Sequence, residues 1–382
     1  STSSSSNSSR SCPVGNVTIA DLAQQLGISK ASVSYALNGR AGVGQETRDR
    51  VLALAAELGW YASSSARALS QSRSGTVGIV LLRDPEHVGS EPFYMNVLAG
   101  IEAVLGEREL NLMLRIVAPD GGTRVVLPGA PRAAQPVPDA APDPAPRLDL
   151  AVYRRWVGER RVDGVLVFDE TRDDPRGPLL ERLGLPFVVV GAAGAPAARS
   201  ASTVVDQAGD AAAMIQALHA LGHSCFAYVS GPPELVHEQA RRDLMAGQAR
   251  DLGMMAFVAA SDYTAQDGEA ATIALVAGLE PRSKHFPTAI VYGNDLMALG
   301  GLAALKRLGI RVPEQVSVVS WDDSIICQFS SPPIAALARN ITELGRQSAL
   351  LLLDIVDGHA AGNVAMPAGI LQRRGSLGAA PT

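Results

Sequence analysis

Small donor side chains gather at the start of one short amphipathic segment near the N-terminus. Lys30, Ser32 and Ser34 follow a turn at Gly27, and residues 17–26 before that turn also have helical spacing of apolar residues. Two helices joined at a glycine suit the major groove of DNA when the second opens on small or polar residues, because bulky ones would keep it from the base edges. The alternative is a helical protein-interaction bundle, since such helix pairs are common.

Other chemistry-bearing patterns are weaker. His219 and His223 stand at i and i+4, but no acidic residue follows His219, and the pair spans the end of an expected helix. The loop from Gly191 to Gly194 follows a strand, yet Pro196 comes next, so no helix N-terminus is available for a pyrophosphate. No lysine follows a glycine in a phosphate-binding loop. The sequence therefore predicts no metal, no cofactor and no enzymatic activity.

Charge is distributed unevenly along the chain. The net charge is -5, but residues 1–75 carry seven basic and four acidic side chains, which gives +3 there and -8 for the rest. A basic end on an acidic body is consistent with local binding of a polyanion. The three cysteines, Cys12, Cys225 and Cys327, are widely spaced and suit a reducing cytoplasm. The apolar runs are too short to cross a bilayer, and no secretory signal is recognised.

Capping residues divide the N-terminal region into three expected helices. Thr18 with Asp21 resembles a capping box, and Ser29 is a second N-cap. Gly59 supplies a C-terminal stop after the third segment. These signals predict a small helical domain over residues 16–62 that follows a disordered tail, 1–15.

The remainder alternates apolar strands with helices. Residues 63–75 form a polar linker that could fold on contact, and the 76–382 region follows it. Eight apolar runs are expected strands: 77–82, 112–117, 164–168, 187–190, 226–229, 256–259, 289–292 and 316–321. Continuous apolar strands separated by helices predict an α/β fold with parallel sheets, in two lobes. Residues 119–147, rich in Pro, Ala and Gly, are an expected surface insertion.

Three stretches together resemble the lactose/galactose repressor (LacI/GalR) family. "VTIADLAQQLGISKASVSYALNG" and "ETRDRVLALAAELGWYASSSARALS" are similar to its helix-turn-helix headpiece and hinge, and "YGNDLMALGGLAALKRLGIRVPEQVSVVSWDDS" is similar to its sensor domain. The resemblance covers roughly residues 16–375. It implies a two-lobed sensor with the fold of periplasmic sugar-binding proteins, and a bacterial, cytoplasmic, nucleoid-associated repressor that binds a palindromic operator as a homodimer.

The resemblance also implies which residues contact the operator. In the headpiece and hinge they are Thr18, Ser29, Lys30, Ala31, Ser32, Ser34, Tyr35, Asn38, Ala66, Arg67 and Leu69. Leu69 matches a leucine that wedges between base steps in the minor groove, and Ala66 matches a small residue where two hinge helices meet. Tyr35 stands where many members have Arg, and Ala62 and Ser63 replace the usual Pro-Asn. The operator sequence is therefore open.

For the sensor, the resemblance implies an effector between the lobes, expected to be a sugar or a sugar derivative. The residues it assigns to this site are Phe93, Arg241, Tyr263, Asn294 and Asp322, with Arg242 as a rival to Arg241. For each, the alternative is a structural hydrogen bond or core packing.

Three classes of function compete: a ligand-controlled repressor, a secreted solute-binding protein and a sugar-converting enzyme on the same scaffold. The headpiece favours the first class, and the lack of a catalytic pair or cofactor loop disfavours the third. The tail after Gln372 has no heptads for a tetramerising coiled coil, so a dimer is predicted.

Overall fold

The computed structural model describes residues 17–60, 73–118, 147–192, 198–280 and 283–381. The chain divides into two compact units, residues 1–72 and 73–382, and each is considered by itself. The division falls within the predicted linker 63–75. Ala66, Arg67 and Leu69, the predicted tail 1–15 and all but the last residue of the predicted insertion lie outside the described residues.

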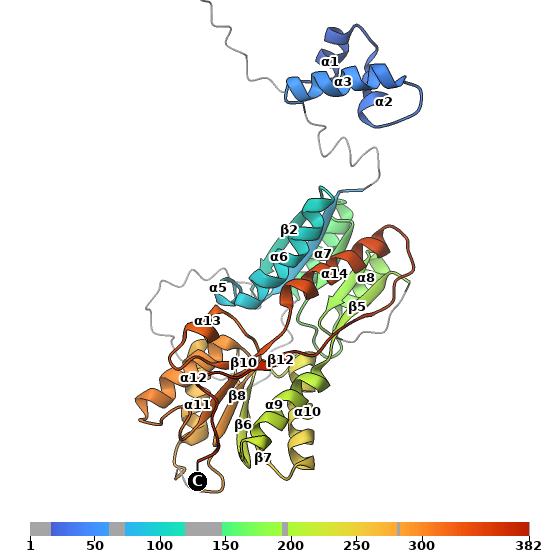
Figure 1. The fold of residues 1–382 in the computed structure, drawn as a ribbon. Coiled ribbons are helices and arrows are strands. Elements are labelled where there is room, and N and C mark those ends of the chain that lie inside the picture. The colour runs from blue at the N-terminus through green and yellow to red at the C-terminus, as the bar shows by residue number, and fades with distance from the viewer. Residues whose placement is uncertain (1–16, 61–72, 119–146, 193–197, 281–282, 382) are drawn as a thin grey trace, which may run out of the picture. The chain divides into compact units, whose positions relative to one another are not determined.

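The first unit is a bundle of three helices (Figure 1), namely α1 Ile19–Leu26, α2 Lys30–Leu37 and α3 Gln45–Glu57. The predicted caps are confirmed: Thr18 and Asp21 form a capping box, and the Ser29 hydroxyl accepts from the Ser32 N–H at 3.0 Å. Gly27 and Gly59 have φ near +65° just after helices α1 and α3, a conformation that glycine adopts without strain. The apolar core consists of Leu22, Ala23, Val33, Ala36, Val51 and Ala55.

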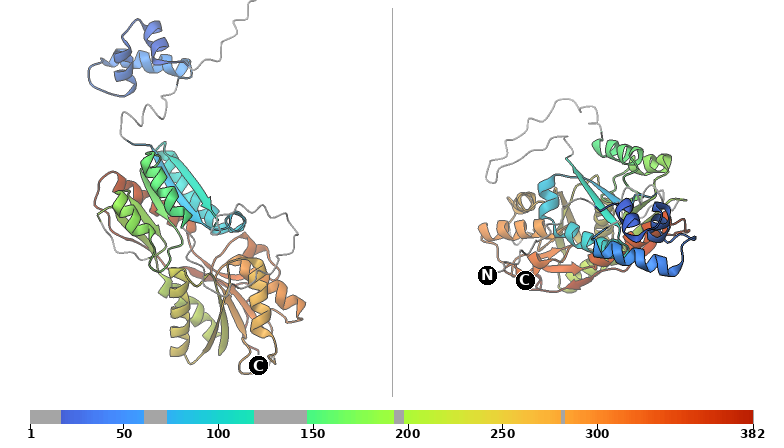
Figure 2. Two further views of the ribbon diagram at one scale, coloured as in Figure 1. Left: turned by 180° about the vertical axis from the view of Figure 1, so that it is seen from behind. Right: turned by 90° about the horizontal axis from the view of Figure 1, so that it is seen from above.

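The second unit contains two α/β lobes, as predicted (Figure 2). The sheet of lobe 1 is parallel throughout, in the order β11-β5-β4-β3-β1-β2. Its strands are β1 Thr76–Leu82, β2 Asn111–Val117, β3 Gly164–Val167, β4 Phe187–Val190, β5 Ser200–Val205 and β11 Val364–Met366. Helices α6 Pro92–Glu107 and α14 Ile341–Val356 cover one face, and α7 Leu148–Gly158 and α8 Arg176–Leu183 cover the other. The short helix α5, Pro85–Ser90, follows β1.

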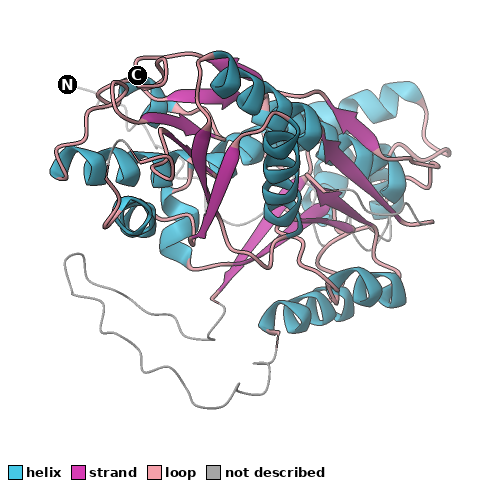
Figure 3. Cartoon of the chain, turned by 90° about the horizontal axis from the view of Figure 1, so that it is seen from below, coloured by secondary structure: helices cyan, strands magenta, loops and turns pink. Residues whose placement is uncertain are grey.

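Lobe 2 repeats this design with the strand order β12-β10-β9-β8-β6-β7. Figure 3 shows the strands of the chain with helices beside them. Its strands are β6 Cys225–Ser230, β7 Met255–Ala260, β8 Ala289–Tyr292, β9 Ser317–Ser320, β10 Ala335–Ala338 and β12 Ile370–Gln372. Helices α9 Gln207–Ala220 and α10 Val236–Asp251 cover one face, and α11 Ala265–Val276 and α12 Asp295–Arg307 cover the other. The short helix α13 is Ile325–Phe329. Only β12 is antiparallel to its neighbour among the strands described.

The chain passes between the lobes three times, between β5 and α9, between β10 and α14, and between β11 and β12. Helix α14 thus returns to lobe 1, where its backbone touches that of α6. A Cβ on Gly100 would lie 1.8 Å from the Thr342 carbonyl oxygen, and one on Gly345 would lie 2.1 Å from that of Val97. Only glycine allows this approach, which anchors the β10–α14 crossover beside the lobe interface.

One residue of the weaker motifs, His223, has a structural role. His223 contacts the Thr288 hydroxyl at 2.9 Å and the Gly378 carbonyl at 3.1 Å, after α9 ends at Ala220. No group of three His, Cys, Asp or Glu side chains able to hold a metal occurs among the described residues. In the same part of the chain, no helix is long and apolar enough to cross a membrane.

Candidate functional site

A cavity of about 600 Å³, counting the space at its mouth, lies between the two lobes. Three of its charged residues follow the carboxyl ends of strands: Arg83 follows β1 and Asp169 follows β3, while Asp322 follows β9 in the other lobe. Ligands of open parallel sheets bind at these strand ends. The lining residues are Arg83, Glu91, Phe93, Tyr94, Phe168, Asp169, Val190, Gly191, Val205, Gln207, His237, Arg241, Tyr263, Gly293, Asp322, Arg339 and Leu344.

The structure brings four of the five expected effector residues to this cavity. Phe93, Arg241, Tyr263 and Asp322 line it. Arg242 does not line it and is partly exposed beside Asp243, so the geometry favours Arg241 of the two candidates.

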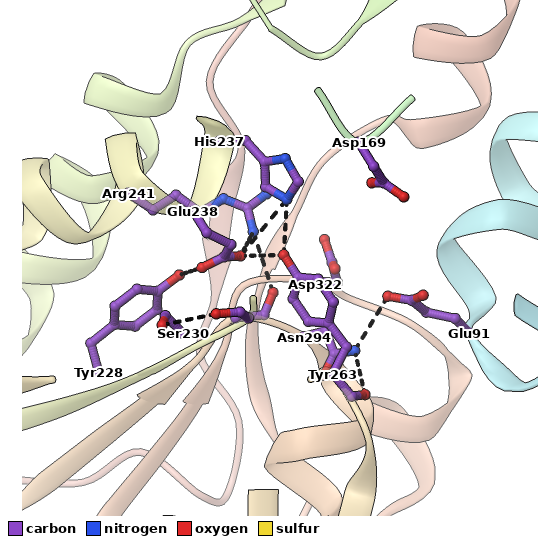
Figure 4. A network of polar contacts seen from close by, with 12 residues as sticks. Glu91, Asp169, Tyr228, Ser230, His237, Glu238, Arg241, Tyr263, Asn294 and Asp322 are labelled. Carbon is purple, nitrogen blue, oxygen red and sulfur yellow. Dashed lines mark hydrogen bonds and ion pairs between the residues drawn. The ribbon is translucent and has the colours of Figure 1, made fainter. Parts of the chain in front are cut away.

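Asn294 lies beside the cavity and differs from the expectation. Its side-chain oxygen accepts from the Met297 N–H at 2.9 Å and so caps α12. Its amide donates to the Tyr263 carbonyl at 3.0 Å and, across the lobe interface, to Glu91 at 3.4 Å (Figure 4). Both polar atoms are therefore committed to the protein, and Asn294 positions its neighbours.

A buried network in lobe 2 holds Arg241 in place. Arg241 donates to Glu238 at 2.8 Å, and the hydroxyls of Tyr228 and Tyr263 donate to the same carboxylate at 2.7 and 2.5 Å (Figure 4). Burial alone would raise the pKa of Glu238, but Arg241 and these hydroxyls more than offset it, so the pKa lies below its usual range. The Arg241 guanidinium also stacks over Trp321, 4.6 Å from the ring centroid. Glu238 is thus ionised, and it holds these side chains of lobe 2 in place.

Tyr263 presents its ring in a constrained geometry. Its φ is +71°, which is uncommon for a residue other than glycine and is associated with functional sites. The ring lies parallel to that of His237, at 6.5 Å between centroids, and His237 contacts the Tyr263 hydroxyl at 2.8 Å. Burial and the charge of Arg241 lower the pKa of His237 to about 4, so the imidazole is neutral at pH 7.

Lobe 1 contributes a second polar cluster, which sequence reasoning missed. Arg83 lies 3.4 Å from Glu91 and 3.5 Å from Asp169, and its guanidinium sits 5.1 Å from the Tyr263 ring centroid of the opposite lobe. The Tyr94 hydroxyl donates to Asp169 at 2.6 Å. Burial raises the pKa of Glu91 to about 8, with Arg83 opposing the rise.

Arg339 was also missed, and it joins the cavity to a crossover between the lobes. It pairs with Asp322, and its guanidinium lies 3.9 Å from Asp210 on α9. Asp210 in turn accepts from the Gly369 N–H at 2.7 Å in the β11–β12 crossover. Asp322, which lines the cavity, is therefore connected through Arg339 and Asp210 to the chain segments between the lobes.

The lobes also touch outside the lining of this cavity, where Glu170, Arg172 and Val236 line a second pocket. The Val236 N–H donates to the Glu170 carbonyl at 2.9 Å, and Arg172 donates to Gln239 at 2.7 Å. Together with the hydrogen bond between Asn294 and Glu91, these contacts join the two lobes.

A sequence signal could have located part of the missed set. Arg83 and Asp169 come directly after apolar strands, as Asp322 does, and such positions meet at the ligand-binding edge. Glu91, His237 and Arg339 belong to helix termini and a crossover, where no strand pattern precedes them.

In the first unit, helix α2 carries the expected DNA-contacting side chains on an accessible surface. Thr18, Ser29, Lys30, Ala31, Tyr35 and Asn38 are exposed, and Ser32 and Ser34 are half-buried. Val33 and Ala36 on the opposite face are buried in the bundle. The Ser29 and Ser32 hydroxyls lie 2.9 Å apart, and Asn38 donates to the Ser34 carbonyl at 2.8 Å, so these groups are also bonded locally.

Comparison with known proteins agrees with both units. Residues 18–63 match the model of bacterial regulatory proteins of the lacI family, and residues 215–377 match a periplasmic binding protein-like domain. The regulator MalR of Streptomyces coelicolor is 30% identical over 373 residues, covering 95% of this chain and 97% of its own. The regulator CelR of Thermobifida fusca is 28% identical over 348 residues, covering 89% and 92%.

Solved structures extend the likeness. A CelR–cellobiose complex has a TM-score of 0.65 at 26% identity and covers 94% of this chain and all of its own. The lac repressor dimer bound to operator and an anti-inducer shares the fold, with a TM-score of 0.72 at 21% identity and coverage of 95% and 99%. The chain therefore belongs to the LacI family of DNA-binding transcriptional regulators, which join a helix-turn-helix headpiece to a periplasmic-binding-protein-like sensor.

Proposed function

We propose that this protein is a repressor that binds a palindromic operator as a homodimer and changes its operator affinity when a sugar or sugar derivative occupies the cavity. The observation that carries this proposal is the cavity itself, where aromatic faces and paired charged groups from both lobes converge. Rings that stack on a pyranose and fixed carboxylate and guanidinium groups that bond hydroxyls suit a polyhydroxylated ligand. The relative CelR, solved with cellobiose, supports the same ligand class.

The proposed change in operator affinity depends on the fact that the residues lining the cavity come from both lobes. Phe93, Arg83 and Asp169 belong to lobe 1, and Tyr263, Arg241 and Asp322 belong to lobe 2. A ligand that bonds both walls favours the closed arrangement by its differential affinity for the two states. Typical coupling between two such sites is ~1–3 kcal/mol, enough for a 5- to 150-fold change in operator affinity.

An exposed apolar surface supports the homodimer. Phe329 is 81% exposed, Ile325 is 67% exposed and Met95 is 63% exposed. The start of α6, which carries Met95, lies on the same side of the sensor unit as α13, which carries the other two, in opposite views (Figures 1 and 2). Large apolar side chains that are exposed on two such elements are candidates for burial at a protein interface. The partner we assign to this surface is a second copy of the chain.

The experiment that tests the effector site compares two adjacent aspartates. Asp322 lines the cavity and pairs with Arg339, whereas Asp323 pairs with Arg374 at 2.7 Å and does not line the cavity. An operator is first selected from random duplexes, and its affinity is then measured by fluorescence anisotropy with cellobiose, maltose and their monosaccharides. We expect Asp322→Ala to abolish the release caused by the active sugar and Asp323→Ala to retain it. Equal loss in both variants, or no release by any sugar, contradicts the proposal.

The homodimer is tested by sedimentation. Phe329→Asp should convert the dimer to a monomer, while Leu252→Asp, at an exposed apolar position after α10, serves as the control. A Phe329→Asp protein that sediments as a dimer rejects this surface.

A further inference from the structure

The cavity and its immediate surroundings hold more carboxyl groups than cationic groups. Among the described residues, the guanidinium groups here are those of Arg83, Arg241 and Arg339, and the carboxyl groups are those of Glu91, Asp169, Asp210, Glu238 and Asp322. His237 adds no charge, because burial and Arg241 lower its pKa to about 4.

Three guanidinium groups serve these five carboxyl groups. Arg241 bonds Glu238 at 2.8 Å and Arg339 bonds Asp322. Arg83 is shared between Glu91 at 3.4 Å and Asp169 at 3.5 Å, and Asp169 also accepts from the Tyr94 hydroxyl at 2.6 Å. Two carboxyl groups, those of Glu91 and Asp210, are then without a full counter-charge of their own.

These two surplus carboxyls differ in position. Asp210 does not line the cavity and accepts from the Gly369 N–H at 2.7 Å. Glu91 lines the cavity wall and is only 7% exposed, at the first position before α6. Its contacts with Arg83 and Asn294 are both long, at 3.4 Å.

The groups that face Glu91 come from several elements. Arg83 approaches it from the end of β1, Asp169 from the end of β3 and Asp322 from the end of β9, and Asn294 approaches from the start of α12. Burial is the main cause of its raised pKa, and the charges of Asp169 and Asp322 add to it while Arg83 and Asn294 oppose it. Figure 4 shows the Glu91 and Asp169 carboxyls on the lobe 1 side, across from Asn294 and Asp322.

We propose that Glu91 sets effector specificity by charge, and that the effector presents a protonated amino group to it. This inference rests on the proposed function, since it assumes that the cavity takes a sugar-like ligand. An ammonium group would favour ionisation of Glu91 and give the carboxylate the partner that the protein does not supply, because charge-assisted hydrogen bonds are stronger than neutral ones. A phosphate would meet guanidinium groups that are already paired and would offer Glu91 no cation. Amino sugars should therefore bind more tightly than the neutral or phosphorylated forms of the same sugar.

The test uses matched sets of one sugar in four forms. For the gluco and galacto series, the intact protein is titrated calorimetrically at about pH 7.5 with the parent sugar, the 2-amino sugar, the N-acetylated amino sugar and the 6-phosphate. The N-acetyl form retains the substituent but removes its charge. We expect the amino form of at least one series to bind at least tenfold more tightly than its three counterparts. In Glu91→Gln this preference should disappear, whereas Glu86→Gln, at an exposed glutamate on α5, should retain it.

Each outcome decides the proposal. It is overturned if a neutral, acetylated or phosphorylated form binds as tightly as the amino form, if Glu91→Gln keeps the preference, or if no amino sugar binds. A neutral sugar that binds and releases the operator would leave the proposed function standing while removing this inference. Amino sugars that bind through Glu91 without altering operator affinity would support this inference and contradict the proposed function.

Discussion

Replacing Asn294 with alanine tests whether this residue positions the cavity or only contacts a ligand. The substitution removes the α12 cap, in which Asn294 accepts from the Met297 N–H at 2.9 Å. It also removes the donor to the buried Tyr263 carbonyl at 3.0 Å and the contact with Glu91 across the lobes. A residue that only contacts a ligand would leave the ligand-free stability unchanged.

The expected loss follows from these contacts. Removing an Asn cap costs ~1 kcal/mol, within 0.5–2. Leaving a buried carbonyl without its donor costs about 1–3 kcal/mol more. The free energy of unfolding of the ligand-free sensor should therefore fall by ~2–4 kcal/mol. At roughly 2–4 °C per kcal/mol for a domain of this size class, the melting temperature should fall by about 4–16 °C.

Two variants separate the cap from the buried donor. Asn340 caps α14 by accepting from the Glu343 N–H at 2.9 Å, but its side chain is exposed, so Asn340→Ala should lose only the cap. Asn294→Ser keeps a capping hydroxyl and loses the amide, so it should fall between wild type and Asn294→Ala. Calorimetric melting without ligand measures all three. If Asn294→Ala and Asn340→Ala lose the same stability, the amide contacts contribute nothing and the positioning role is wrong.

The remaining predictions concern titration and DNA. Burial raises the pKa of Glu91 from its ordinary value of 4.5 to about 8 in the folded protein, so protonation favours the folded state and the stability associated with Glu91 is lost as pH rises from 4.5 through 8. Between about pH 5 and 8.5, the free energy of unfolding of Glu91→Gln, measured in urea, should rise relative to that of wild type by on the order of 4 kcal/mol. If the difference between the two proteins does not change with pH, Glu91 is not buried as described. Lys30→Ala should lower the slope of log operator affinity against log salt by about one unit, and an unchanged slope would exclude a phosphate contact. Leu69→Ala, outside the described residues, should weaken specific binding more than non-specific binding in gel-shift titrations, and equal losses would exclude a wedge.

The headpiece could be predicted closely because its signals are local. Caps such as Thr18 and Ser29 and the left-handed glycines Gly27 and Gly59 act within one helical turn, so the sequence contains both partners. Six of the eight predicted strands were found for a similar reason: buried parallel strands form continuous apolar runs. The other two, β2 and β7, are partly exposed edge strands that are nevertheless rich in apolar residues.

The missed strands depend on distant parts of the chain. Strand β5, Ser200–Val205, is half polar, yet its Thr203 hydroxyl is buried against the Ser348 hydroxyl of α14 at 2.9 Å. Strand β10, Ala335–Ala338, has the composition of a helix and is fixed by pairing with β9 and β12. No local pattern predicts an environment created by residues outside the strand itself, which for Thr203 and Ser348 are 145 positions apart.

The same distinction applies to the cavity. Asp322, Arg241 and Tyr263 could be placed because the resemblance covers the segments around them, and the structure puts them on one wall. On the opposite wall, Arg83 follows an apolar strand and could have been placed at this edge, whereas Glu91 precedes helix α6 and has no strand pattern before it. Asn294 shows the converse: a polar residue in a recognised motif can be committed to the protein on every side.

The balance of contacts between the lobes suggests how a ligand could control them. The short ion pairs at the cavity lie within one lobe, such as Arg241 with Glu238 at 2.8 Å. Short contacts across the lobes, such as Arg172 with Gln239 at 2.7 Å, lie outside the cavity lining. The cross-lobe contacts beside the cavity are weaker, with Glu91 and Asn294 at 3.4 Å and Arg83 at 5.1 Å from the Tyr263 ring centroid. Because a ligand shifts an equilibrium only by its differential affinity for the two states, contacts to residues of a single lobe that persist in both states would not shift closure. An effector that bonds Glu91 on one wall and the Tyr263 side on the other replaces these long contacts with short ones, and it is that gain which would favour the closed state.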